Sequence, residues 1–118
     1  MILDEIDFEL QAGSEATYRW TLSDLDLTGV SEAKFALFSD FGKVPVLVAS
    51  SLNGSGARIV VNSASGRIDL ILPGSATKSL VTRGAEFIGR FQCELRFSDG
   101  SEVIFARGPA TVARDGII

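Results

Sequence analysis

Apolar and polar residues alternate along most of this chain with a period of two, which is typical of half-buried β-strands. Residues 17–23, TYRWTLS, would turn Tyr18, Trp20 and Leu22 to one side. Residues 66–73, GRIDLILP, alternate in the same way except at Ile71. The pattern predicts strands at these two places and at 6–11, 33–39, 44–49 and 58–62.

The longest alternation covers residues 86–98, EFIGRFQCELRFS. One face would carry the apolar side chains and the other face Arg90, Gln92, Glu94 and Arg96. The segment 101–107 would return as the second arm of a hairpin through the Asp-Gly turn that precedes it.

Two registers of this hairpin are compatible with the turn. A two-residue Asp99-Gly100 loop would turn Val103 and Phe105 to the polar face, since a slip of one residue exchanges the faces of a strand. A three-residue turn with a glycine bulge would set Leu95 opposite Val103, Cys93 opposite Phe105, and Glu102 opposite Arg96. The second register buries more apolar surface, so it is the one we predict.

Glycine-rich turns separate the remaining strands at the spacing expected of a β-sandwich. Gly108-Pro109 is expected to interrupt the ladder before a last stretch at 110–113, because proline lacks a backbone donor. The segment PGSATKSLVTRG is the one place where a helical turn is expected, at 76–80. We predict a single all-β domain, 1–118, with seven to eight strands.

The composition narrows the classes of function. The chain has 118 residues, 46% of them hydrophobic, which is enough for one core without disulfides or a structural metal. Its net charge is −4 and its eleven basic residues are scattered, so no nucleic-acid partner is expected. No apolar run approaches the ~20 residues of a membrane span, so no membrane partner is expected. The acidic start MILDEIDFEL does not fit a signal peptide and indicates synthesis in a cytoplasm.

The single cysteine, Cys93, is open to four interpretations: a nucleophile, a metal ligand, half of an intermolecular disulfide, or packing. A nucleophile needs a lowered pKa, and the chain has no histidine to provide it. Zinc sites need about four ligands, typically Cys or His. The alternation puts Cys93 between Phe91 and Leu95 on the apolar face, which favours packing.

Other candidate sites are incomplete. The stretch DLDLTG, with Asp24 and Asp26, lacks the further ligands of a calcium loop and is expected to be a turn closed by its own side chains. The stretch LNGSGAR lacks the lysine of a phosphate-binding loop, and no GxSxG motif is present. We therefore predict a protein that is not an enzyme, with no catalytic, cofactor-binding or metal-binding residues.

Exposed apolar side chains remain as candidates for protein contacts. Phe41 lies in a turn, and Ile117 and Ile118 form an apolar tail, so these three are the predicted interface residues. An exposed patch on Val46 and Val48 would also suit a subunit interface. Trp20 and Tyr18 are expected inside the core.

The order of these features resembles a class of small phage structural domains. The carrying motifs are an opening hairpin, the turn Asp26-Leu27-Thr28-Gly29, and the Gly66–Pro73 strand followed by a helical turn. A closing pattern follows at Gly89, Phe91, Glu94, Leu95, Phe97, Asp99 and Gly100. This is similar to the N-terminal β-sandwich of phage baseplate upper proteins and of related small tail or prophage proteins. The chain departs from that class in having Phe91 where tyrosine is usual.

The resemblance implies an antiparallel, immunoglobulin-like β-sandwich with a structural role in a phage tail, baseplate or neck. Its partners would be other virion proteins or further copies of itself, in the virion or, during assembly, in the host cytoplasm. The alternative is a carbohydrate- or peptide-binding β-sandwich, which a solvent-facing Trp20 would favour.

Overall fold

The computed structural model describes residues 8–11, 15–22, 26–39, 44–78 and 87–113. These residues form β-strands and one five-residue helix, so the all-β prediction is confirmed. The elements are β1 (Phe8–Gln11), β2 (Ala16–Thr21), β3 (Val30–Ser39), β4 (Leu47–Ser50), β5 (Arg58–Asn62), β6 (Arg67–Leu72), α1 (Gly74–Lys78), β7 (Phe87–Phe97) and β8 (Glu102–Ala113).

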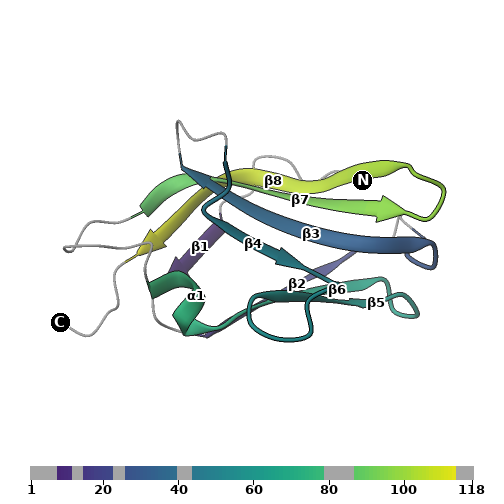
Figure 1. The fold of residues 1–118 in the computed structure, drawn as a ribbon, viewed down its shortest axis with the longest axis horizontal. Coiled ribbons are helices and arrows are strands. Elements are labelled where there is room, and N and C mark those ends of the chain that lie inside the picture. The colour runs from purple at the N-terminus through teal and green to yellow at the C-terminus, as the bar shows by residue number, and fades with distance from the viewer. Residues whose placement is uncertain (1–7, 12–14, 23–25, 40–43, 79–86, 114–118) are drawn as a thin grey trace.

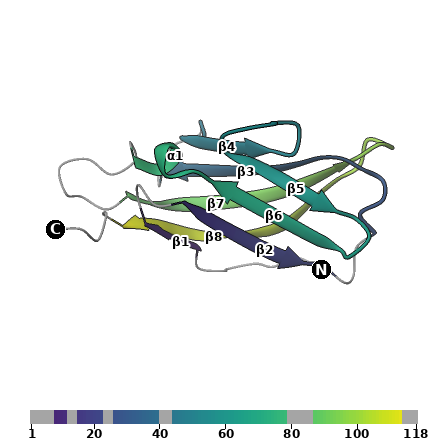
Figure 2. The same ribbon diagram turned by 90° about the horizontal axis from the view of Figure 1, so that it is seen from below.

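The eight strands belong to one mixed sheet in the order β1-β8-β7-β3-β4-β5-β6-β2. The sheet curls into a half-barrel, with β8, β7 and β3 across the upper part of Figure 1 and β2, β6 and β5 across the lower part. In the view from below, β2, β6 and β5 pass in front of the other layer (Figure 2). The concave side of the curl holds the core.

Two strand pairs are parallel, which corrects the prediction of an antiparallel sheet. β1 runs parallel to β8, with Phe8 opposite Ala110, and β4 meets β5 in parallel at Ser50 and Arg58. The expected opening hairpin is also wrong, because β2 pairs with β6 and stands at the other end of the strand order from β1. Alternation within a strand specifies its faces but not its neighbours, so the pattern could not reveal this.

Aromatic side chains join the two ends of the sheet. The rings of Phe8 in β1 and Tyr18 in β2 have centroids 4.5 Å apart, and the Tyr18 hydroxyl donates to the carbonyl oxygen of Glu9. Phe8 also contacts Phe35 and Phe91, whose ring centroids lie 5.3 and 4.9 Å from its own. Burial of these large rings is the dominant favourable term for a core of this kind.

The β7–β8 hairpin confirms part of the predicted register. Leu95 lies opposite Val103 and Arg96 opposite Glu102. The predicted pairing of Cys93 with Phe105 is wrong, because the register shifts between Cys93 and Glu94 and brings Ala106 opposite Cys93. A β-bulge of this kind inserts one residue into one strand.

Gly108-Pro109 does not interrupt β8, which corrects a second detail of the hairpin. Gly108 lies opposite Phe91 and Pro109 opposite Arg90, and the strand continues to Ala113. Proline removes one donor but its backbone remains extended, so a strand can pass through it. The irregularity that we expected there lies instead at the bulge.

The helical turn lies two residues earlier than predicted. α1 starts directly after Pro73, whose carbonyl oxygen accepts a hydrogen bond from the Ala76 amide at 2.9 Å. Thr77 is buried, and its hydroxyl donates to the Gly74 carbonyl oxygen at 3.2 Å. Residues 79 and 80 of the predicted turn lie outside the described part of the chain.

Candidate interaction surface

The outward side chains of β3 and β7 stand in four rows across the two strands. The strands are antiparallel neighbours, and the residues between these outward positions are buried in the core. Directly opposite residues on one face of such a pair have Cβ atoms about 4.5–5.5 Å apart, so they contact one another. The rows are Glu32 with Arg96, Lys34 with Glu94, Ala36 with Gln92, and Phe38 with Arg90.

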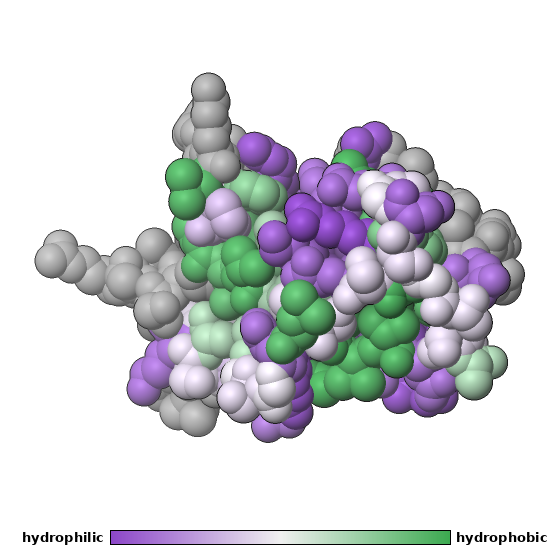
Figure 3. Space-filling model, turned by 45° about the vertical axis from the view of Figure 1, so that its right-hand side comes forward, coloured by the Kyte–Doolittle hydropathy of each residue, from purple (hydrophilic) through white to green (hydrophobic). Residues whose placement is uncertain are grey.

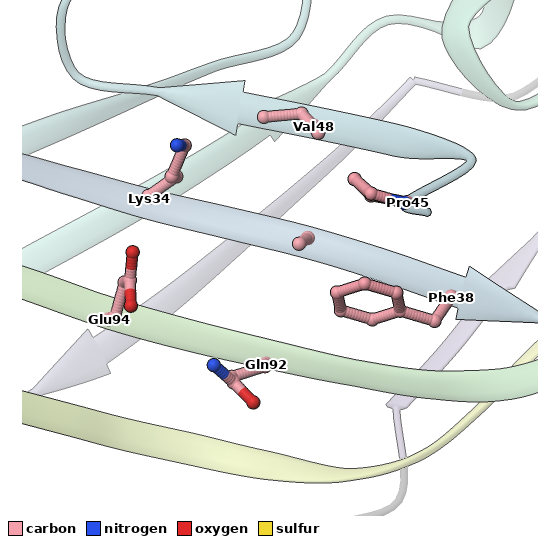
Figure 4. Close-up of a pocket in the computed structure, with 7 residues that line it drawn as sticks. Lys34, Phe38, Pro45, Val48, Gln92 and Glu94 are labelled. Carbon is pink, nitrogen blue, oxygen red and sulfur yellow. The ribbon is translucent and has the colours of Figure 1, made fainter. Parts of the chain in front are cut away.

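A shallow depression of about 240 Å³ lies over the middle of these rows. Lys34 and Glu94 stand at one end of it, and Phe38 and Pro45 stand at the other (Figure 4). Val48 of β4 closes one side. The depression is therefore charged at one end and apolar at the other.

The approach to β4 adds exposed apolar surface beside this depression. Val44, Val46 and Val48 are 76%, 45% and 38% exposed, so Val46 and Val48 form the kind of exposed apolar patch that would suit a subunit interface. Val48 lies directly opposite Ala36 of β3. Figure 3 shows apolar surface, in green, between polar areas on this side of the molecule. Clusters of exposed apolar side chains with a polar rim mark interaction sites more often than isolated ones do.

The charged end of the surface centres on Arg96. Its guanidinium lies 3.4 Å from a Glu102 carboxylate oxygen, 3.6 Å from one of Glu94 and 3.9 Å from one of Glu32. The Ser50 hydroxyl donates to the other Glu32 oxygen at 2.6 Å. Such half-exposed pairs stabilise a fold little, about 0–1 kcal/mol each. They hold both signs of charge at fixed positions on the surface.

The other end of the surface carries an aromatic ring beside a cation. The Arg90 guanidinium carbon lies 5.3 Å from the centre of the Phe38 ring, which is within the range of a cation–π interaction. A second depression, of about 270 Å³, adjoins this pair and is also lined by Arg107 of β8.

Cys93 is fully buried and packs in the core, as the alternation predicted. Burial raises the pKa of its thiol, because the thiolate would lose its hydration. A cysteine of this kind is neither exposed nor ionised, so it cannot act as a nucleophile. In the part of the chain that the structure describes, no three metal-binding side chains come together.

Two aspartates in turns accept hydrogen bonds from residues of the same turn. The Thr28 amide and hydroxyl both donate to Asp26 Oδ1, at 3.0 and 2.7 Å, and Ser101 does the same to Asp99 at 2.8 and 2.6 Å. These hydrogen bonds lower the pKa of both carboxyl groups. The prediction that DLDLTG is a turn is confirmed at Asp26, and Asp24 lies outside the described residues.

Trp20 is partly buried and packs against the core, as predicted. Its ring meets the buried Phe105 edge-on, with centroids 5.7 Å apart and planes at 78°. A sugar platform needs an open aromatic face, so this placement does not favour a carbohydrate site.

The predicted interface residues Phe41, Ile117 and Ile118 lie outside the residues that the structure describes. No helix among the described ranges is long and apolar enough to cross a membrane. Neither models of known protein families nor curated protein sequences match this chain.

The rows of β3 and β7 are the feature that sequence reasoning missed. The alternation in both segments was visible, and it indicated which side chains face outward. The pairing of two strands about 60 residues apart cannot be seen in a local pattern, because register depends on tertiary packing. The sequence indicated Val46 and Val48 and the polar face of Arg90, Gln92, Glu94 and Arg96, but not how β3 and β7 combine them into one surface.

Proposed function

We propose that this protein is a non-enzymatic structural or assembly protein that acts through protein–protein contacts on the outer face of β3, β4 and β7. The observation that carries the proposal is the exposed valine cluster beside the depression between Lys34 and Phe38. Interfaces combine apolar and polar contacts, and this surface has an apolar end beside a charged end.

The state of the reactive groups supports a role without catalysis. Cys93 is buried and its thiol pKa is raised, whereas a nucleophile requires a lowered one. Asp26 and Asp99 have lowered pKa values and accept hydrogen bonds within their own turns, whereas a general acid needs a raised one. Each group therefore has a structural role.

The phage origin rests on the sequence resemblance. Two of the motifs that carry the resemblance are turns in the fold: Asp26 to Gly29 precede β3, and Asp99-Gly100 lies between β7 and β8. The opening hairpin of that class does not support it, because β1 and β2 do not pair. On this proposal the half-barrel is a variant of the immunoglobulin-like sandwich, with β2, β6 and β5 facing β3, β7 and β8. Its partners are other virion proteins or further copies of the chain, in a tail, baseplate or neck and in the host cytoplasm during assembly.

The alternative of a carbohydrate- or peptide-binding module would be favoured by a solvent-facing Trp20. Trp20 is partly buried and packs against Phe105, so this residue does not support that alternative.

Co-expression with the products of neighbouring genes tests the proposal. We expect the wild-type chain to form a defined complex, with itself or with one of those products, that Val48→Lys abolishes. Val60→Lys is the matched control, because Val60 is also an exposed strand valine but lies on β5. Complexes that withstand Val48→Lys, or the absence of any complex, would contradict the proposed function.

A further inference from the structure

We propose that the outer face of β3 and β7 binds a second copy of this chain across a two-fold axis. The axis runs parallel to the strands, midway between β3 and β7. The inference rests on the proposed function, because it names the partner of the same surface.

The rows across β3 and β7 carry the argument. A two-fold axis along the strands places β3 of one copy over β7 of the other and keeps every row at its own level. Each side chain then faces the residue type that is its own cross-strand neighbour. A two-fold interface requires a surface that is complementary to itself. The two opposite-charge rows and the cation–π row of Phe38 and Arg90 provide this.

Charge complementarity is strongest in two of these rows. Lys34 would face the partner's Glu94 and Glu94 the partner's Lys34, so that this row forms two opposite-charge contacts. Glu32 and Arg96 would form two more. Opposite charges across an interface fix its register and exclude wrong arrangements.

The other two-fold arrangement of this face matches less well. An axis across the strands would place β7 over the partner's β7 with the order of the rows reversed. Arg96 would then face the partner's Arg90, and Lys34 would face Ala36. Like charges in contact are unfavourable, so the axis along the strands is the one that the charges select.

The neighbouring strands supply apolar contact around these charges. The axis places β4 of one copy over β8 of the other. One level of the sheet holds the directly opposite residues Val48, Ala36, Gln92 and Arg107. Val48 would therefore contact the aliphatic stem of the partner's Arg107, since arginine covers apolar surface with its methylene groups. Phe38 would lie over the partner's Arg90, the same type of contact that the two make within one chain.

Charge reversal of one row gives a direct test by sedimentation velocity. We expect the wild-type chain to dimerise, and Lys34→Glu and Glu94→Lys each to weaken dimerisation about tenfold or more, because each variant pairs like charges across the axis. An equimolar mixture of the two variants should dimerise again. The Lys34→Glu copy is acidic at positions 34 and 94, and the Glu94→Lys copy is basic at both. In the mixed dimer, each acidic position therefore faces a basic one.

The mixture separates an interface from an effect on folding. Each variant keeps a like-charge pair within its own chain, so recovery on mixing can arise only between copies. The controls are two single variants, Arg19→Glu and Asp69→Arg, at a directly opposite pair on β2 and β6. Dimerisation should be unchanged in each of these variants and in their equimolar mixture.

Two results would overturn the inference: a wild-type chain that stays monomeric up to millimolar concentration, or a mixture no more associated than its components. The proposed function would survive either result if a complex with another protein still depended on Val48. It would fail separately if Val48→Lys left that complex intact.

Discussion

Cys93 lies directly opposite Ala106, one residue away from the pairing that plain alternation gives. The bulge leaves Phe105 and Ala106, which are consecutive, both fully buried. Beyond the bulge the even-numbered residues of β8 face inward instead of the odd-numbered ones, so Ala110 and Val112 are buried as well. One inserted residue therefore keeps both halves of a twelve-residue strand directed at the core.

The first prediction concerns the accessibility of Cys93. A bulky thiol reagent should not modify the native protein and should react fully once the chain is unfolded in denaturant, because the thiol is buried. Absorbance of the released chromophore measures both reactions. Fast modification of the native protein would show that Cys93 does not lie on the inner face.

Stability at alkaline pH provides a second prediction from the same residue. The folded chain holds the thiol protonated because burial raises its pKa, while the unfolded thiol ionises above about pH 8.5. The contribution of Cys93 is thus fully present below that pH and declines as pH rises, by up to about 1.4 kcal/mol per pH unit. Urea denaturation from pH 7 to 10 should show a steeper decline in the wild type than in Cys93→Ala, since both proteins keep Tyr18, whose pKa is also raised by burial. Parallel curves for the two proteins would be inconsistent with a buried thiol.

A third prediction addresses the bulge. Phe105→Ala should lower the free energy of unfolding by about 3–5 kcal/mol, because Phe105 is fully buried and its removal leaves a cavity beside Trp20. Trp20, the chain's one tryptophan, reports unfolding by its fluorescence. Phe105→Leu keeps part of the volume and should fold with a smaller loss. Val60→Ala, at an exposed site, is the control, and equal losses at positions 105 and 60 would contradict the assigned core.

A fourth prediction compares glycines in two turns. Gly66 has φ +67°, and a Cβ there would lie 3.2 Å from the Leu22 carbonyl oxygen. Gly66→Ala should therefore destabilise the fold by about 1–2 kcal/mol, the cost of a left-handed L-residue. Gly54→Ala should be close to neutral, since a Cβ there meets no heavy atom within 4 Å. Thermal denaturation of both variants checks this, and the reverse order of stabilities would show that the β5–β6 turn is misplaced.

The fifth prediction concerns acid. The Arg19 guanidinium donates hydrogen bonds to both carboxylate oxygens of Asp69, at 2.8 and 3.2 Å, and lowers the pKa of that carboxyl group. The pair's contribution is therefore present above about pH 4 and is lost as pH falls through the lowered folded pKa. The loss should be small, because the pair is exposed to solvent. Urea denaturation at pH 6 and pH 3 should show a larger change for the wild type than for Asp69→Asn, and equal changes would exclude the pair as a source of acid sensitivity.

Local pattern predicted the strands far better than their arrangement. The Arg58–Asn62 strand was located with its exact bounds, and Tyr18, Trp20 and Cys93 were assigned to the correct side. The mixed order of the sheet escaped prediction, because the position of β1 beside β8 depends on how Phe8 packs with rings from β2, β3 and β7. The bulge could not be predicted for a related reason, since an inserted residue shows only in the register with the partner strand.

The candidate surface, too, could be predicted from the sequence only in part. Val46 and Val48 could be singled out as candidates for a patch, since they stand at alternate positions in a short apolar stretch, and both are exposed. The match of Lys34 with Glu94 could not, because it depends on the register between β3 and β7. Paired positions on distant segments become visible only when the strands are placed side by side.

The most direct test of the contact surface is the backbone NMR spectrum of the wild-type protein, recorded as its concentration is raised. We predict concentration-dependent shifts of the amides of Lys34, Ala36, Val48, Gln92 and Glu94, with those of β2, β5 and β6 unchanged. Shifts centred on β2, β5 and β6, or a spectrum independent of concentration, would contradict self-association through the outer face of β3 and β7.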